Sequence, residues 1–211
     1  MLYFRKICGK ELCYISSMDK KTTKYYKEHA SEFIESTFNA DLSSLYSFFL
    51  QYIPSSGKIL DLGCGSGRDS LYFKNKGYDV YSIDIIEEMI SNCKKLGLEK
   101  SYCTSIEDYN PSFKFDAIWS LASLVHHSKG ECALALNKIN SILRKDGILY
   151  LSLVKGEGEF SDSNSRLYSG YTSKEVYDML IKEGFDIIQI DESDDSLKRS
   201  RKWINALARK R

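Results

Sequence analysis

Hydrophobic positions along the chain change between a helical and an extended period, and each change predicts a boundary between elements. From Tyr26 to Thr37, and again from Leu42 to Ile53, residues of one buried face recur at three- and four-residue steps, which is typical of helices. The stretch Pro54-Ser55-Ser56-Gly57 predicts the end of the second helix. The short apolar run from Ile59 to Leu62 then predicts a buried strand.

Strands and helices alternate through the rest of the chain. Glycines at positions 77, 97, 147 and 184 stand where helices should end, and Thr172-Ser173-Lys174-Glu175 is a capping box that should begin the last helix. The helices are expected around 71–73, 87–96, 132–143 and 173–180. We predict strands at 59–62, 80–84, 101–104, 115–119, 148–154, 185–190 and 203–208.

This alternation predicts an α/β fold, with a doubly wound, mostly parallel sheet of seven strands and helices on both faces. No helix separates the last two strands, so one strand near the C-terminus should run antiparallel to its neighbours. The sequence has no internal repeat and no linker, which indicates a single domain over residues 21–211. Sheets of this kind bind ligands at the carboxyl ends of their strands.

Composition and charge narrow the class of protein. The chain has 211 residues, of which 43% are hydrophobic, so it can bury a core and global disorder is excluded. Its net charge of +1 argues against a polyanion-binding protein, and no apolar run is long enough to span a membrane. Six cysteines without metal or redox spacing, only three histidines and no secretory signal predict a cytoplasmic protein without a metal site.

A glycine-rich turn follows the first strand of the sheet. It reads Asp61-Leu62-Gly63-Cys64-Gly65-Ser66-Gly67-Arg68, and its glycines let the backbone turn tightly and let a ligand approach closely. Asp84 ends the second strand about 20 residues later, where an acid grips the hydroxyls of a ribose. A packing turn and a helix N-cap are the structural alternatives for the two features. Together they favour a nucleoside ligand.

Two residues of this turn argue against a dinucleotide. Arg68 stands where the dinucleotide fingerprint has its third glycine or an alanine. Asp61 would repel a pyrophosphate, whereas a carboxylate suits a cationic ligand such as an ammonium or a sulfonium. A nicotinamide-dependent oxidoreductase is therefore disfavoured.

These segments resemble the class I S-adenosylmethionine-dependent methyltransferases over about residues 22–209. The turn at 60–67 is similar to their first motif and Asp84 to their second-strand acid. Residues 67–72 and 77–80 look most like the tellurite-resistance-type small-molecule members. Three further segments match the family in order: Ser105-Ile106-Glu107-Asp108, Phe115-Asp116-Ala117-Ile118-Trp119-Ser120 and Leu143-Arg144-Lys145-Asp146-Gly147-Ile148-Leu149.

The resemblance implies that S-adenosyl-L-methionine is the cofactor and that the fold is the Rossmann-like methyltransferase fold. It assigns the methionine part to Asp61 and the backbone of 63–67, and the ribose to Asp84. The family has an acid where Ser105 stands, and Arg68 either pairs with the methionine carboxylate or caps its helix. The implied cofactor-binding residues are Asp61, Gly63, Cys64, Gly65, Gly67, Arg68, Asp84, Ile85, Ile106, Glu107 and Ser120.

The sequence contains no clear motif for the residues that bind the methyl acceptor. This is expected, because methyl transfer needs mainly alignment and a pocket without water. His126 and His127 follow the fourth strand, and one of them is a candidate to accept a proton or orient the acceptor, with His126 preferred and packing as the alternative. Tyr26 lies in an N-terminal helical segment, 21–55, that is either a lid over the site or plain core. The long loop at 155–166 is expected to select the acceptor.

The preferred hypothesis is a methyltransferase that acts on a small molecule. An RNA- or protein-directed enzyme of the same fold and a non-catalytic cofactor-binding domain are the alternatives. The basic tail after Leu197 follows several acids, so a self-neutralising hairpin is preferred over RNA contact, and both a monomer and a homodimer fit the sequence. Residues 1–20 are predicted to be an extension, disordered or packed as an arm, and Met18 looks like a native start.

Overall fold

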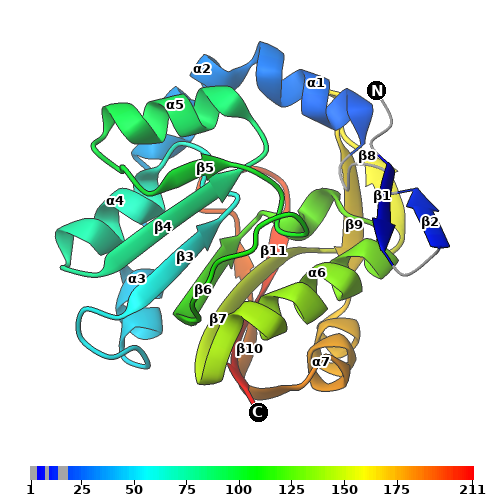
Figure 1. The fold of residues 1–211 in the computed structure, drawn as a ribbon. Coiled ribbons are helices and arrows are strands. Elements are labelled where there is room, and N and C mark those ends of the chain that lie inside the picture. The colour runs from blue at the N-terminus through cyan, green and yellow to red at the C-terminus, as the bar shows by residue number, and fades with distance from the viewer. Residues whose placement is uncertain (1–3, 8–9, 14–18) are drawn as a thin grey trace.

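The computed structural model describes residues 4–7, 10–13 and 19–211, with side chains described from residue 19. A mostly parallel sheet lies at its centre (Figure 1). Its strands follow the order β10-β11-β7-β6-β3-β4-β5, and β9 pairs with the end of β7 and with β8. The strands are β3 (Lys58–Leu62), β4 (Asp79–Asp84), β5 (Ser101–Cys103), β6 (Phe115–Leu121), β7 (Leu143–Lys155), β8 (Glu159–Ser161), β9 (Leu167–Tyr171), β10 (Phe185–Asp194) and β11 (Lys202–Lys210).

The predicted fold class is confirmed. β3, β4, β5, β6 and β7 pair in parallel, whereas β11 runs antiparallel to both β7 and β10. The physical reason is the one expected from the sequence, because the short connection between β10 and β11 only allows a hairpin. Seven strands form the main path of the sheet. β9 pairs with the carboxyl end of β7, and β8 pairs with β9.

Helices cover both faces of the sheet. α3 (Ser43–Leu50) and α4 (Arg68–Asn75) pack on one face, α6 (Lys129–Ile142) and α7 (Ser173–Lys182) on the other, and α5 (Glu87–Lys95) lies over β4 and β5. The capping box at Thr172 and Glu175 begins α7 as predicted. Gly77, Gly97 and Gly184 adopt the positive φ expected after the ends of α4, α5 and α7.

The strands alternate between the two hydrophobic clusters of the core. Ile59, Trp119 and Tyr150 face α3 and α4, where the rings of Trp119 and Tyr150 stack with centroids 4.1 Å apart. Leu60 and Ile118 face α6 and α7 instead. Neighbouring residues in one strand thus point to opposite faces, and a central sheet must be apolar on both.

Three predicted boundaries are wrong. The single helix expected from Tyr26 to Thr37 is two helices, α1 (Lys20–Glu28) and α2 (Ala30–Phe38), since His29 leaves the helical conformation at φ −118° and ψ 23°. β7 begins at Leu143, which pairs with Phe115, rather than at Ile148. The segment after β7 was expected to be a polar loop, but it contains β8 and β9. No hydrophobic run in the sequence predicted these two strands.

Part of the predicted N-terminal extension forms a small hairpin. β1 (Phe4–Ile7) and β2 (Lys10–Cys13) pair antiparallel with each other in a two-stranded sheet. Whether residues 1–20 form a dispensable extension or a packed arm stays a prediction. The predicted start at Met18 lies outside the described residues. Within the described part of the chain, no helix combines the length and the apolar character needed to cross a membrane.

Candidate functional site

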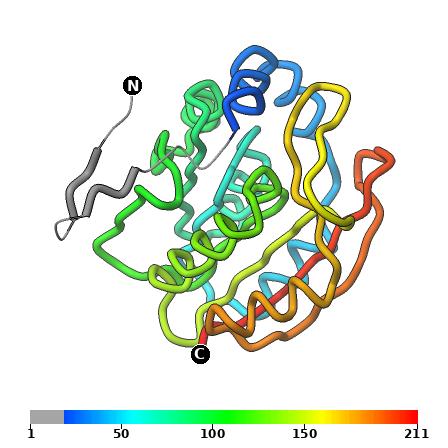
Figure 2. Tube along the Cα trace, turned by 90° about the vertical axis from the view of Figure 1, so that its right-hand side faces the viewer, coloured from blue at the N-terminus to red at the C-terminus, as the bar shows by residue number. Residues whose placement is uncertain are grey.

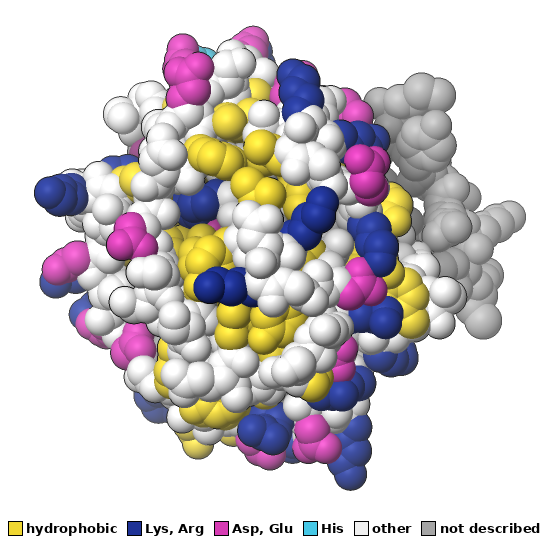
Figure 3. Space-filling view, turned by 90° about the vertical axis from the view of Figure 1, so that its left-hand side faces the viewer, with side chains coloured by type: hydrophobic (Ala, Val, Ile, Leu, Met, Phe, Trp, Pro, Cys, Tyr) yellow, Lys and Arg dark blue, Asp and Glu magenta, His cyan; other side chains and the backbone are white. Residues whose placement is uncertain are grey.

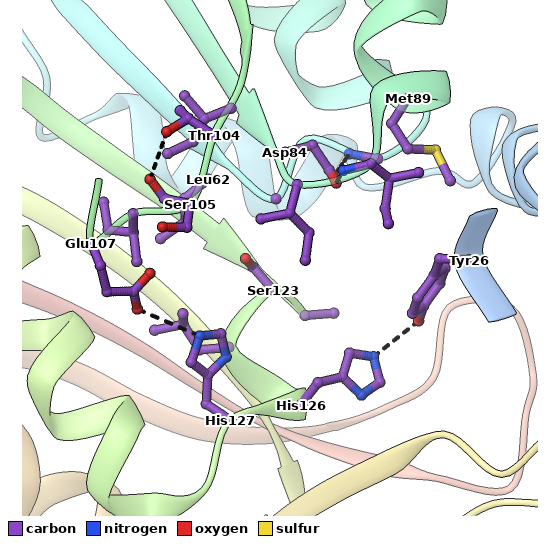
Figure 4. Close-up of a pocket in the computed structure, with 18 of the residues that line it drawn as sticks. Tyr26, Leu62, Asp84, Met89, Thr104, Ser105, Glu107, Ser123, His126 and His127 are labelled. Carbon is purple, nitrogen blue, oxygen red and sulfur yellow. Dashed lines mark hydrogen bonds and ion pairs between the residues drawn. The ribbon is translucent and has the colours of Figure 1, made fainter. Parts of the chain in front are cut away.

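The carboxyl ends of β3, β4 and β6 open into a pocket of about 730 Å³ (Figure 4). The turn after β3, Asp84 at the end of β4 and the segment after β6 all contribute to its lining. This pocket is called the first pocket below. It is lined by Tyr26, Phe33, Leu62, Gly63, Gly65, Ile83, Asp84, Ile85, Ile86, Met89, Thr104, Ser105, Ile106, Glu107, Ala122, Ser123, Leu124, His126 and His127.

The glycine turn brings bare backbone to the pocket wall. Gly63 and Gly65 both have positive φ, 68° and 49°. A Cβ atom on Gly63 would lie 2.2 Å from the Ser123 Oγ, and one on Gly65 would lie 3.2 Å from the Phe33 ring. Side chains are excluded at both positions by conformation and by contact. Gly67, also at positive φ, packs against Cys93 beneath α4 and lines neither pocket described here.

Asp84 is fixed by backbone donors. Its Oδ2 accepts the Gly65 N–H at 3.0 Å, and its Oδ1 accepts the Ile86 N–H at 2.9 Å. Burial raises the pKa of this carboxyl, and the backbone donors partly offset that rise. Each carboxylate oxygen keeps a further lone pair toward the pocket, which suits a ligand with two adjacent hydroxyls.

The opposite end of the pocket is apolar with a polar edge. Ile85 and Ile106 line it, as the resemblance implied, together with Ser105 and Glu107. Burial alone would raise the pKa of Glu107, but the nearby His127 ring, the Glu107 backbone N–H and Ser105 outweigh it, so the pKa is lowered. The His127 Nε2 lies 3.7 Å from the Glu107 Oε1, so His127, which the sequence suggested for the acceptor, lies beside Glu107 instead. Such a wall fits a planar base with a hydrogen-bonding edge.

Two residues assigned by the resemblance lie elsewhere. Asp61 is 2% exposed and lines neither pocket, because its Oδ2 accepts the Ser70 hydroxyl at 2.5 Å beneath α4. Ser120 is fully buried in β6 and also lines neither pocket. The geometry therefore gives no support to a direct contact of either side chain with a ligand. Both precede the ends of their strands, where the chain is still inside the sheet.

A second pocket of about 970 Å³ adjoins the first. The two share Tyr26, Phe33, Gly63, Gly65 and Ala122, so they meet beside the glycine turn and the start of the segment after β6. Cys64 and Arg68 line only the second pocket. Arg68 donates to the Asp69 Oδ1 at 2.6 Å and to the Thr37 carbonyl at 3.0 Å, which ties α4 to the end of α2.

Tyr26 and His126, the two acceptor-side candidates, are hydrogen-bonded to each other. The Tyr26 hydroxyl lies 3.0 Å from the His126 Nε2, while the His126 Nδ1 lies 2.5 Å from the Leu167 carbonyl (Figure 4). A carbonyl only accepts, so Nδ1 carries the proton and Nε2 accepts from Tyr26. Burial lowers the pKa of His126 to about 4, which keeps the ring neutral. The pair is a fixed hydroxyl with a neutral imidazole behind it.

α1 and the segment of β8 and β9 contact each other beside the second pocket, to which they contribute Tyr26, Arg166 and Tyr168. In Figure 2 the segment around residues 155–170 stands next to the N-terminal helices, and the turn before β11 lies beside it. The Leu167 N–H donates to the Thr22 Oγ1 at 2.9 Å, and Asn164 donates to the Tyr25 hydroxyl at 3.2 Å. The N-terminal helix thus contacts the loop expected to select the acceptor, and both border one cavity.

The outer wall of the second pocket contains functional candidates that the sequence did not single out. They are Arg166 and Tyr168 at the start of β9, and Arg201 and Trp203 at the start of β11. The loop at 155–166 was recognised by its length alone, and the basic hairpin was interpreted as a solvated surface. No local pattern marks these four residues, because their proximity depends on the antiparallel placement of β11.

Comparison with known proteins gives a consistent family. Residues 60–151 match the family described as Methyltransferase domain. YqeM of Bacillus subtilis (strain 168), which carries a methyltransferase name, is 36% identical over 66 residues, or 31% of this chain. The tRNA (carboxymethyluridine(34)-5-O)-methyltransferase ALKBH8 of Mus musculus is 25% identical over 154 residues, or 72% of this chain. The matched parts span 27% and 22% of those proteins, so this chain covers about a quarter of each.

A solved structure shows the same fold over nearly the whole chain. It is the 1,6-didemethyltoxoflavin-N1-methyltransferase of Burkholderia thailandensis with 1,6-didemethyltoxoflavin and S-adenosylhomocysteine bound. The TM-score is 0.70 at 20% sequence identity, and the match covers 97% of this chain and 96% of that one.

The residues of the first pocket fit the same cofactor. Bare backbone at Gly63 and Gly65, a carboxylate at Asp84 and an apolar end with a polar edge suit the methionine, ribose and adenine parts respectively. The family match begins at Leu60 and so includes this turn. Residues 60–151 thus match a methyltransferase-domain family, and the chain as a whole shares its fold with a methyltransferase solved with S-adenosylhomocysteine bound.

Proposed function

We propose that this protein transfers the methyl group of S-adenosylmethionine to a small-molecule acceptor in the second pocket. The observation that carries the proposal is the junction of the two pockets at Tyr26, Phe33, Gly63, Gly65 and Ala122. A cofactor in the first pocket and an acceptor in the second would meet there. α1 and the β8–β9 segment border the second pocket, so water can be excluded from the junction.

The chain's own residues bind and align the two molecules. When bound, S-adenosylmethionine supplies an activated methyl group on its sulfonium sulfur. Asp84 accepts the ribose hydroxyls, the Gly63–Gly65 backbone carries the methionine part, and Ile85, Ile106 and Glu107 surround the adenine. Arg68 already pairs with Asp69, which favours its helix-bracing role over a contact with the methionine carboxylate. Alignment of this kind supplies much of the rate of a displacement reaction.

On the acceptor side, Tyr26 is the group that touches the substrate and His126 positions it. The neutral His126 ring accepts the Tyr26 hydroxyl proton in a hydrogen bond, and Arg166 donates to the same hydroxyl at 3.3 Å. Tyr26 lines both pockets, so its oxygen is fixed at their junction. From there it can orient the acceptor's nucleophilic atom toward the methyl group.

A tRNA acceptor is the second candidate, and the match to ALKBH8 is what favours it. The distribution of charge favours the small molecule. The net charge is +1, and on the face shown in Figure 3 Lys and Arg are interspersed with Asp and Glu around a hydrophobic centre. Proteins that bind nucleic acid need a basic surface to neutralise phosphates. A labelled-methyl assay on tRNA and on a metabolite extract separates the two: label on tRNA alone would overturn the proposal.

Cofactor binding is tested with S-adenosylhomocysteine and Asp84→Ala. We expect S-adenosylhomocysteine, and not NAD, to raise the melting temperature. Asp84→Ala should weaken its binding by about 1–3 kcal/mol, because two ribose hydroxyls lose a charged acceptor. Titration calorimetry measures the loss. Asp79→Asn, at the other end of β4, is the matched control and should bind normally, since Asp79 pairs with Lys58 and Lys100 away from the pocket. Unchanged affinity in Asp84→Ala would place the ligand elsewhere.

A further inference from the structure

The outer wall of the second pocket is built from arginines and aromatic rings. The Arg201 guanidinium lies 4.5 Å from the centroid of the Tyr168 ring and 5.9 Å from that of Trp203. Arg166 lies 5.6 Å from the Tyr168 ring on the same wall. Side-chain exposure is 11% for Arg166 and 20% for Arg201, so both guanidinium groups are largely removed from water.

The charges of this wall do not balance. Arg166 binds Asp162 through two nitrogens, at 2.9 Å from Nε and 2.6 Å from Nη2. Arg201 reaches the same Asp162 oxygen only at 3.9 Å, beyond hydrogen-bond distance. The remaining charged lining residues have partners of their own: Arg68 with Asp69, Arg199 with Asp195, and Asp194 with Lys202. One carboxylate therefore serves two arginines, and one positive charge is in surplus.

A buried hydroxyl lies on the same pocket. Ser152 on β7 is 1% exposed, and its Oγ has no hydrogen-bond partner among the described residues. A buried polar group without a partner costs free energy unless a ligand satisfies it. The largely buried Arg201 guanidinium and the unsatisfied Ser152 hydroxyl line the same pocket. A negatively charged hydrogen-bond acceptor would satisfy both.

We propose that the methyl acceptor carries an anionic group, a carboxylate or a phosphate, which Arg201 binds with help from Arg166 at the outer wall. This inference rests on the proposed function and names the acceptor's class. The planar guanidinium fork matches the geometry of both oxyanions, and the surplus charge is neutralised when they bind. The rings of Tyr168 and Trp203 hold the fork in place and offer apolar contact to the rest of the acceptor.

The experiment uses the S-adenosylhomocysteine-loaded protein and three probes of one shape. Benzoate and phenyl phosphate carry the anion, and benzamide is the neutral counterpart. Calorimetric titration in low-chloride buffer should show both anions, or one of them, binding at least about tenfold tighter than benzamide, as expected for a charge-assisted contact. The preferred anion distinguishes a carboxylate acceptor from a phosphorylated one.

Arg201→Gln tests the assignment of the wall. It should abolish the preference for the anions, whereas Arg201→Lys, which keeps the charge, should retain part of it. Lys174→Gln removes a charge on α7, where the side chain is 79% exposed and lines neither pocket, and should change nothing. Normal affinity for S-adenosylhomocysteine in each variant shows that the fold is intact.

The outcomes separate the two proposals. A wild-type protein that binds no S-adenosylhomocysteine fails the proposed function. If it binds S-adenosylhomocysteine but takes up benzamide as tightly as the anions, or binds none of the three probes, only the anionic acceptor is overturned. An anion preference that survives in Arg201→Gln also overturns the inference, because the anion then binds elsewhere.

Discussion

Asp61 shows how a single residue can match a family pattern and still lie outside both described pockets. Its carboxyl is enclosed beneath α4, where it accepts the Ser70 hydroxyl, which in turn lies 2.7 Å from the Ser82 hydroxyl. Burial, with the negative charge of Asp69 as the next cause, raises the pKa of Asp61 to about 8. The folded protein thus holds a proton here that the unfolded chain releases at pH values above 3.8.

Asp61→Asn should make the protein's stability less dependent on pH. Wild-type stability falls as pH rises from about 4 toward 8, because folding then requires uptake of a proton. The variant lacks this proton, so its free energy of unfolding should decline less, by up to about 1.4 kcal/mol per pH unit. Urea unfolding from pH 5 to 8.5 measures the slope.

The same variant tests whether Asp61 touches the cofactor. Because its carboxyl lines neither pocket, Asp61→Asn should bind S-adenosylhomocysteine as tightly as the wild type. A loss of affinity as large as that in Asp84→Ala would show that Asp61 contacts the methionine part after all.

At the scale of an element, α1 connects segments that are distant in the chain. Its Thr22 and Tyr25 contact the β8–β9 segment, and its Tyr26 reaches His126 after β6. Asp19 caps the helix by accepting the Lys21 and Thr22 N–H groups, and its pKa is lowered by these contacts, that of Thr22 foremost. The helix is therefore placed by its ends and by the side chains that it directs at the pockets.

Tyr26→Phe should lower the rate of methyl transfer and leave cofactor binding intact. The hydroxyl at the junction is lost, so the acceptor is less well aligned and kcat should fall about 10- to 100-fold. Affinity for S-adenosylhomocysteine should stay within about threefold, which is under 1 kcal/mol. Tyr25→Phe is the matched control on the same helix, because its hydroxyl contacts Asn164 away from the junction, and it should remain active.

The pH profile gives a second measure of this pair. Since the pKa of His126 is about 4, wild-type kcat should show no inflection near the ordinary histidine value of 6.5. An inflection there that disappears in Tyr26→Phe would indicate that His126 exchanges a proton during the reaction and is more than a positioning residue.

For the whole molecule, the order of the strands decides which segments meet at the carboxyl ends of the parallel strands, where the two pockets lie. β3 and β4 bring the glycine turn and Asp84 together, while β7, β9 and β11 bring the outer wall to the same edge. β1 and β2 pair with each other, and no strand of the nine-stranded sheet pairs with them among the described residues.

A chain that begins at Met18 should therefore keep the melting temperature and cofactor affinity of the full chain. The main sheet and both pockets are built from residues after 18, so their contacts survive the truncation. Differential scanning calorimetry and titration with S-adenosylhomocysteine check this. A fall of several degrees in the melting temperature would mean that residues 1–17 pack on the domain and contribute to its stability.

The sequence by itself determined the alternation of elements, the antiparallel C-terminal strand, and the turn with Asp84. These features follow from periodicity, capping and turn residues, which act over a few neighbouring positions. Asp84 could be paired with the turn because consecutive parallel strands place their carboxyl ends at one edge. The sequence did not predict the break between α1 and α2. The apolar face that includes Tyr26 and Phe33 continues across His29, although the backbone there is not helical.

Only the tertiary structure decided which residues meet at the second pocket. Tyr26 and His126 are 100 positions apart, and Tyr26 and Arg166 are 140 apart, yet both pairs are hydrogen-bonded. In the sequence, Arg201 is one charged residue of a hairpin. In the structure, the pairing of β11 with β7 places it beside Tyr168. Such contacts depend on strand order and on the path of the loops, which no local periodicity encodes. The burial of Asp61 away from both pockets depends on the tertiary structure in the same way.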